Sequence, residues 1–283
     1  MKRFSLPLLL LFVLLGLTGC PPDTEFPPTF ITITDFQLQT NVEVAPTTNI
    51  TEVWAFANEE FIGAFPLPAR IPVLRTGDVT LRFEAGVKQN GISTTPEIYE
   101  FYTPVERNIN LTPGETIDLG TLIINYRPNV RFAIFETFEE GFTRAFTEQV
   151  AGEARLLSSQ ESVRTGSFSG RLQLTEDDPL VEIATTEIFS GLTDERPYVW
   201  LELDFRSAVD VQWGVTGVQG IDVIRRFDPS FRPRDEWTKI YFNMSETVVL
   251  SMLNNYKFNF TALLPAGLTE GDLYLDNIKL LYF

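Results

Sequence analysis

Cys20 is the residue of this 283-residue chain whose type and position most clearly point to chemistry. It is the only cysteine, and it follows Leu17, Thr18 and Gly19 at the end of an apolar run. Two basic residues precede that run, which is typical of a secretory signal. The run is shorter than the roughly 20 apolar residues that span a bilayer. Because a lone thiol in an exported chain forms no internal disulfide, another use of Cys20 is expected.

The composition excludes several classes of function. The chain has no histidine, which removes the commonest general base and the commonest transition-metal ligand. Its net charge is −16, with 38 acidic against 22 basic residues, and this charge disfavours nucleic acid as a partner. The sequence contains no phosphate-binding glycine loop and no Gly-x-Ser-x-Gly elbow. Pairs of carboxylates are expected by chance in so acidic a chain, so the sequence predicts a non-enzyme.

A second group of residues suits the binding of a sugar, which requires exposed aromatic rings beside planar polar side chains. Trp200 alternates along one predicted strand with Tyr198, Glu202 and Asp204, so these four share a face. That face is more polar than the valine-rich face of Trp213. Trp200, Tyr198 and Glu202 are therefore the predicted ligand-binding residues. The alternative is that the rings pack in a core, as aromatic side chains at strand period usually do.

These residues must be positioned by strands, because period-two alternation recurs through residues 29–128. At least six short strands are expected there, among them 29–39, 52–56 and 61–65. Prolines at positions 66, 68 and 72 allow only edge or irregular structure. Residues 86–97 are expected to form a polar loop, either a solvated connection or a contact surface. Together these features predict an antiparallel sandwich.

Residues 129–283 continue the alternation, with strands expected at 198–205, 209–215 and 235–242. One helix is expected at 246–253, with Ser245 as its N-cap. Four arginines between positions 225 and 234 form a basic cluster, either solvated or a docking surface for an acidic partner. The predicted fold class is all-β, with two antiparallel β-sandwich domains, the second a jelly roll, after a signal peptide.

The segment Leu17-Thr18-Gly19-Cys20 resembles the lipobox of bacterial lipoproteins. This resemblance implies that residues 1–19 are a lipoprotein signal peptide and that lipid is attached to Cys20. Residues 20–28 then form a proline-rich, acidic spacer. Asp23 and Glu25 resemble the surface-export signal of Bacteroidota lipoproteins. The expected location is the outer membrane, lipid-anchored and exposed at the cell surface, with the periplasmic face as the alternative.

Residues 29–128 resemble immunoglobulin-like or carboxypeptidase-regulatory-like modules in the number of strands and in one short hairpin. Residues 129–283 resemble galactose-binding-like jelly rolls, which include many carbohydrate-binding modules. The matching segments are Thr137-Phe138-Glu139, Gly166-Ser167-Phe168-Ser169, Trp237 and Leu275-Asp276-Asn277.

The jelly-roll resemblance also implies a structural calcium ion between the first and last strands of the second domain. Glu139 and Asp276 would supply carboxylates, and backbone carbonyls near Thr137 and Ser167 would complete the set of oxygen ligands. The alternative is an acidic edge that is hydrogen-bonded to its neighbours.

The function predicted from these features is that of a non-catalytic outer-membrane lipoprotein. It would act as an interaction or scaffold subunit of a surface or envelope assembly. The alternative is a surface lipoprotein that binds glycans with the domain at 129–283. The expected partners are the membrane, through the lipid anchor, other envelope proteins and glycans, but not nucleic acid.

Overall fold

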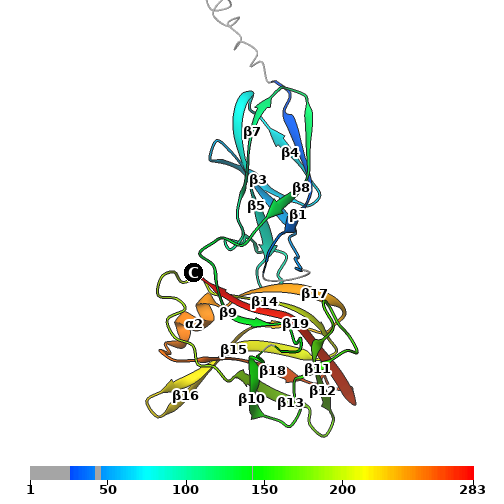
Figure 1. The fold of residues 1–283 in the computed structure, drawn as a ribbon, viewed down its shortest axis with the longest axis vertical. Helices are drawn as coiled ribbons and strands as arrows, with labels where there is room; N and C mark the ends of the chain where they lie inside the picture. The colour runs from blue at the N-terminus through cyan, green and yellow to red at the C-terminus, as the bar shows by residue number, and fades with distance from the viewer. Residues whose placement is uncertain (1–25, 42–45, 142) are drawn as a thin grey trace, which may run out of the picture.

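The computed structural model describes residues 26–41, 46–141 and 143–283, and almost all of its elements are strands (Figure 1). Two β units follow each other along the long axis of the molecule (Figure 1). The all-β prediction is confirmed. The signal segment 1–19 and Cys20 lie outside the described residues. Within the described ranges, no helix has the length and apolar character needed to cross a membrane.

The first unit contains two sheets. One has the order β4-β1-β8, and the other has the order β3-β2-β5-β6, with β7 also paired to β5. Its strands are β1 (Thr29–Leu38), β2 (Glu52–Ala57), β3 (Glu60–Pro66), β4 (Ala69–Val73), β5 (Gly77–Lys88), β6 (Pro96–Ile98), β7 (Val105–Leu111) and β8 (Thr116–Ile124). Pro72 lies in the edge strand β4, where a missing amide donor is tolerated. The ladder between β1 and β8 is parallel, a local departure from the antiparallel pairing expected for this unit.

The second unit contains a six-stranded and a five-stranded sheet. The first has the order β11-β12-β19-β14-β17, with β9 also paired to β19, and the second has the order β10-β13-β18-β15-β16. Its strands are β9 (Arg131–Glu136), β10 (Phe146–Ala151), β11 (Leu157–Ser159), β12 (Ser169–Thr175), β13 (Leu180–Thr185), β14 (Trp200–Ser207), β15 (Asp210–Gln219), β16 (Asp222–Phe231), β17 (Arg234–Asn243), β18 (Lys257–Leu263) and β19 (Glu270–Tyr282). The ladders of both sheets are antiparallel.

The helix α2 spans Ser245–Ser251, so the expected helix exists. Its N-cap residue is Met244, and the expectation of Ser245 in that position is wrong. The reason is that the Ser245 hydroxyl has another partner, since it accepts a hydrogen bond of 2.9 Å from the amide of Val199, the residue before β14.

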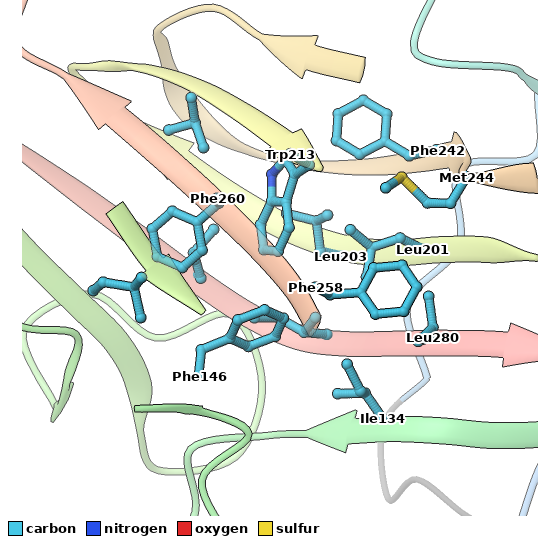
Figure 2. Packing of buried hydrophobic residues seen from close by; sticks show 14 of the residues in the cluster. Ile134, Phe146, Leu201, Leu203, Trp213, Phe242, Met244, Phe258, Phe260 and Leu280 are labelled. Carbon is cyan, nitrogen blue, oxygen red and sulfur yellow. The ribbon is translucent and has the colours of Figure 1, made fainter. Parts of the chain in front are cut away.

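The core of the second unit lies between its two sheets (Figure 2). Trp213 of β15 is fully buried there, as the valine-rich face of its strand predicts. Its ring centroid lies 5.0 Å from that of Phe260 and 5.4 Å from that of Phe146. Leu201 and Leu203 enter the same core from β14 (Figure 2). The side chains that alternate with them on this strand, those of Trp200, Glu202 and Asp204, therefore point to the opposite face of the six-stranded sheet.

That opposite face packs against the first unit. One apolar cluster contains Trp200 and Tyr241 of the second unit together with Tyr99 and Phe101 of the first. The segment after β5, expected as a polar loop over 86–97, takes part in this contact. The Asn90 amide donates to the Tyr241 carbonyl at 2.8 Å. The loop is also shorter than expected, because β5 continues to Lys88 and β6 begins at Pro96.

Trp200→Ala is expected to lower the free energy of unfolding by about 3–5 kcal/mol, because it empties a buried site between the units. Trp237→Ala, at a half-buried position of β17, is the matched control and should cost less. Urea unfolding of both variants checks this. Equal losses for the two tryptophans would contradict the packing between the units.

Candidate functional site

The three residues predicted to bind ligand are buried between the two units. Trp200 and Glu202 have an exposed fraction of 0%, and Tyr198 has 7%. The Trp200 ring meets the edge of the Tyr99 ring, with a centroid distance of 5.3 Å. The expectation of an exposed aromatic platform at Trp200 is thus corrected. The face is polar, as predicted, but the first unit covers it.

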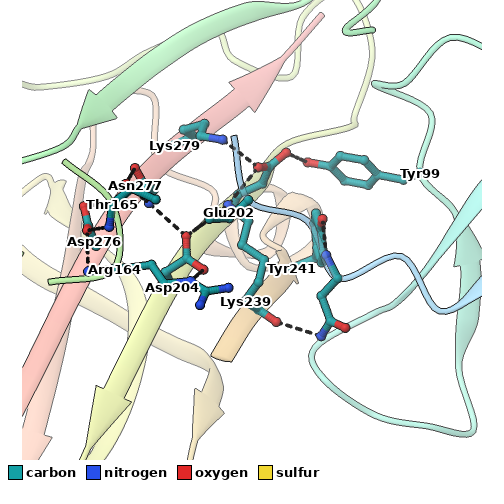
Figure 3. Close-up of polar contacts among 12 residues, drawn as sticks. Tyr99, Arg164, Thr165, Glu202, Asp204, Lys239, Tyr241, Asp276, Asn277 and Lys279 are labelled. Carbon is teal, nitrogen blue, oxygen red and sulfur yellow. Dashed lines mark hydrogen bonds and ion pairs between the residues drawn. The ribbon is translucent and has the colours of Figure 1, made fainter. Parts of the chain in front are cut away.

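Glu202 is the centre of a buried ionic cluster on this face (Figure 3). Its carboxylate accepts a hydrogen bond from the Tyr99 hydroxyl at 2.7 Å and another from Lys279 Nζ at 3.2 Å. Lys239 Nζ lies 3.3 Å from the same carboxylate. Burial alone would raise the pKa of Glu202, but the ammonium groups of Lys279 and Lys239 outweigh it and hold the pKa at about 2.

Asp204, two residues further along β14, is also enclosed by donors (Figure 3). Thr47 of the first unit donates its hydroxyl hydrogen to Asp204 at 2.5 Å, and Asn277 donates from its side-chain amide at 3.1 Å. Arg164 Nε lies 3.4 Å from the carboxylate. Glu202 and Asp204 thus each accept a hydrogen bond from the first unit, Glu202 from Tyr99 and Asp204 from Thr47. The cluster therefore lies within the buried contact between the two units.

Three of the four residues predicted to hold calcium, Glu139, Ser167 and Asp276, lie in or are hydrogen-bonded to the loop 164–168. Glu139 accepts hydrogen bonds from the Ser167 and Phe168 amides at 2.7 and 3.0 Å. Asp276 accepts one from the Thr165 amide at 3.1 Å. Burial raises the pKa of Asp276 to about 7, against the lowering effect of its amide donors.

This geometry leaves calcium a restricted set of ligands. Within the described ranges, no group of three or more Asp, Glu or Cys side chains is placed to hold a metal ion. Thr137 Oγ1, however, is buried with no hydrogen-bond partner, and a cation would satisfy it. The predicted ion would draw its oxygen ligands from Thr137, Glu139 and Asp276, of which Thr137 Oγ1 is the one with an unsatisfied polar atom. Calcium binding stays a prediction.

A cleft on the outer face of the five-stranded sheet has a different character. Its volume is about 460 Å³. Its floor is a cross-strand row in which Thr216 of β15 pairs with Arg225 of β16 on one side and with Lys257 of β18 on the other. Side chains of one row point to the same face of a sheet. Aliphatic side chains form the walls, and the lining includes Val150, Ile188, Val218 and Val223.

The charges in this cleft are paired. Arg225 Nε lies 3.4 Å from Glu182 Oε1, and Lys257 is ion-paired with Glu148. Glu182 also accepts a hydrogen bond of 2.8 Å from the side-chain amide of Asn259. Asn259 Oδ1 is buried without a hydrogen-bond partner in the described part of the chain. The cleft lining thus offers the planar guanidinium of Arg225 beside apolar walls, and both cations of the lining are ion-paired, Arg225 with a carboxylate that lies outside the lining.

Sequence reasoning identified one member of this cleft and missed the others. Arg225 was recognised as part of a basic cluster. Its partner Glu182 lies on β13, and two other strands, β18 and β15, separate β13 from β16 in the sheet. The alternation of Thr216 and Val218 on one face of β15 was a usable signal for an open, mixed face.

The chain matches no protein family and no curated protein. Several solved structures that are similar to this chain are carbohydrate-binding modules. One, from the β-sandwich superfamily and described as promiscuous in specificity, has 14% identity and a TM-score of 0.37, with 81% of this chain and 84% of that chain covered. A variant of a family 29 module has 9% identity and a TM-score of 0.35, covering 54% of this chain and 92% of that one. A xylan-binding domain from Paenibacillus barcinonensis has 12% identity and a TM-score of 0.33, covering 53% and 93%. At these values the neighbours assign no ligand to this chain.

Glu202→Gln is expected to lower the free energy of unfolding at pH 7 by about 3–5 kcal/mol, because it leaves two buried ammonium groups without their carboxylate. The pKa of Glu202 is depressed to about 2 from 4.5, so its contribution is present above pH 4.5 and is lost as the pH falls toward 2. Urea unfolding between pH 2 and 7 should show a smaller acid dependence in the variant. Glu195→Gln, in an exposed ion pair with Arg131, is the control and should change little.

Chelation is expected to lower the melting temperature, because an ion bound only to the folded form stabilises it. Differential scanning calorimetry with EDTA and with added calcium measures the shift. Glu139→Gln should reduce the response to calcium. Identical melting curves with and without the chelator would refute the calcium prediction. The Glu139 and Asp276 carboxylates would then be held by their hydrogen bonds to the loop amides alone.

Proposed function

We propose that this protein binds glycans without catalysis, using the cleft on the outer face of the five-stranded sheet, and that lipid on Cys20 holds it at the outer membrane. The observation that carries the glycan proposal is the composition of the cleft. Aliphatic walls formed by Val218, Val223 and Ile188 stand beside hydrogen-bonding groups on Arg225 and Thr216. Sugars match such a surface, because they present C–H groups and hydroxyls on one small molecule.

The charge balance narrows the ligand to neutral glycans. Both cations of the cleft are neutralised by carboxylates, Arg225 by Glu182 and Lys257 by Glu148. An anionic sugar would have to compete with these carboxylates in a protein whose net charge is already −16. A neutral sugar can accept from the guanidinium and donate to the carboxylate without breaking either pair.

The proposed location is supported by the sequence. The lipobox resemblance ends at Cys20, and the described chain begins at Phe26, three residues before β1. The β1 strand begins at the end of the first unit that is remote from the second unit (Figure 1). The cleft belongs to the second unit. An anchor on Cys20 would therefore leave the first unit between the membrane and the cleft.

The interaction-subunit hypothesis is the second candidate, and one observation favours it. Large apolar side chains are exposed on α2 and on the β15–β16 hairpin, namely Val249, Leu250, Met252, Val218, Ile221 and Val223. Exposed apolar patches often mark protein interaction sites. Affinity capture from solubilised native membranes, with Ile221→Ser as the comparison, tests whether a defined partner depends on this patch.

Arg225→Ala is expected to weaken binding on an array of neutral glycans about tenfold or more, because a charge-assisted hydrogen bond contributes about 1.5–3 kcal/mol and 1.4 kcal/mol is tenfold. Arg232→Ala, at an exposed position outside the cleft, should bind as the parent does. Melting temperatures of both variants establish that they are folded. If the folded parent protein bound no glycan on the array, the proposal would be refuted.

A further inference from the structure

The end of the first unit remote from the cleft carries two exposed apolar side chains. Leu74, in the turn between β4 and β5, has an exposed fraction of 80%, and Phe26 has 64%. Both line a groove of about 750 Å³, which also includes Pro27, Pro28 and Thr76. These residues therefore form one surface, which we call the apical patch.

Strand pairing holds the two halves of the apical patch together. Thr29, which follows Pro28, is opposite Val73, which precedes Leu74, in the antiparallel ladder of β1 and β4. The entering chain and the β4–β5 turn must therefore emerge side by side at the same end of the sheet. The apolar pair is a consequence of the strand register and does not depend on one side-chain rotamer.

We propose that the apical patch lies against the lipid bilayer, with Leu74 and Phe26 in contact with its interfacial region. The inference rests on the proposed acylation of Cys20. Five residues lie between Cys20 and Phe26, and a fully extended chain spans at most about 3.3–3.6 Å per residue. Over these six steps, the backbone of Phe26 therefore stays within about 22 Å of the backbone of Cys20. At that distance the apical patch has a high effective concentration at the membrane, so that a weak contact suffices.

The charges around the patch indicate contact with apolar and zwitterionic lipid instead of attraction to anionic headgroups. Arg75 is the cationic residue of the groove lining, and it is ion-paired with Glu60. Asp78, also in the lining, accepts a hydrogen bond of 2.7 Å from the Asn110 side-chain amide. The patch thus lacks the unpaired basic cluster that draws proteins to anionic lipid.

The contact would set the orientation of the whole molecule. The two units follow each other along the long axis (Figure 1). The apical patch lies where β1 begins and β4 ends, at the end of the first unit that is remote from the second unit. With that end on the bilayer, the second unit and its cleft are held away from the membrane surface. A tether without such a contact would leave the cleft free to face the bilayer as often as the medium.

The test uses the mature chain from residue 20, whose only thiol can be coupled to a maleimide lipid in phosphatidylcholine vesicles. Leu74→Trp and, separately, Phe26→Trp place a reporter in the apical patch at exposed positions that accept the larger ring. Ile221→Trp, at a hairpin tip of the second unit that is 98% exposed, is the matched control. Fluorescence is compared in vesicles with and without brominated acyl chains, and the signal of the coupled parent is subtracted.

The expected result is quenching and a shift to shorter wavelength for Trp in either apical position and no change for the hairpin control. Unquenched apical reporters, or equal quenching at both ends, would overturn the membrane contact. Because the thiol is coupled chemically, this failure is separate from failure of the acylation proposal. Mass analysis of the native N-terminus decides acylation on its own.

Discussion

The structure depends on the burial of one polar sheet face between two β units. Glu202 is fully buried, and it is tolerated there because Lys239, Lys279 and the Tyr99 hydroxyl all reach its carboxylate. Removing charges from water costs several kcal/mol per ion, which only close and complete pairing offsets. Such a cluster forms in one relative placement of the units and fails in others. It specifies the arrangement more than it adds to stability.

This constraint decides which surface remains for function. The six-stranded sheet has its core on one face, and the first unit covers the part of its other face around Trp200, Glu202 and Tyr241. The five-stranded sheet has the core on one face only, and its other face carries the open cleft. The exposed polar and aliphatic side chains of β15, β16 and β18 follow from that asymmetry.

The sequence predicted the positions of the strands well, but it did not predict what packs against each face of a strand. Alternation along β1, β2 and β15 identified the strands and placed Trp213 in the core, because period two is a local property. It also grouped Trp200 with Glu202 correctly. What it could not supply is the partner of that face, since Tyr99 is about 100 residues away in the sequence. Polar alternation normally indicates water on one side. Here it indicates a second protein surface.

The sequence pattern also does not show which distant residues surround the cleft and the predicted calcium ligands. Arg225 was visible as one of four clustered arginines, yet the meaning of its charge depends on Glu182, more than 40 residues earlier. Glu139 and Asp276 both accept hydrogen bonds from amides of the loop 164–168, and a resemblance gives no information on which way those amides point. The direction of an N–H bond decides whether a carboxylate is available to a cation.

The proposed membrane contact and the proposed glycan-binding cleft lie on different units, and the buried interface connects them. A membrane contact at the apical patch orients the first unit, and the Glu202 cluster transmits that orientation to the second unit because the interface leaves few alternative placements. The direction of the cleft is then set by residues more than 100 positions apart in the chain, Leu74 and Lys279 among them. If the units moved independently, an orienting contact at one end would have no effect at the other. Rigidity at the interface is therefore the physical condition under which anchoring and binding become one function.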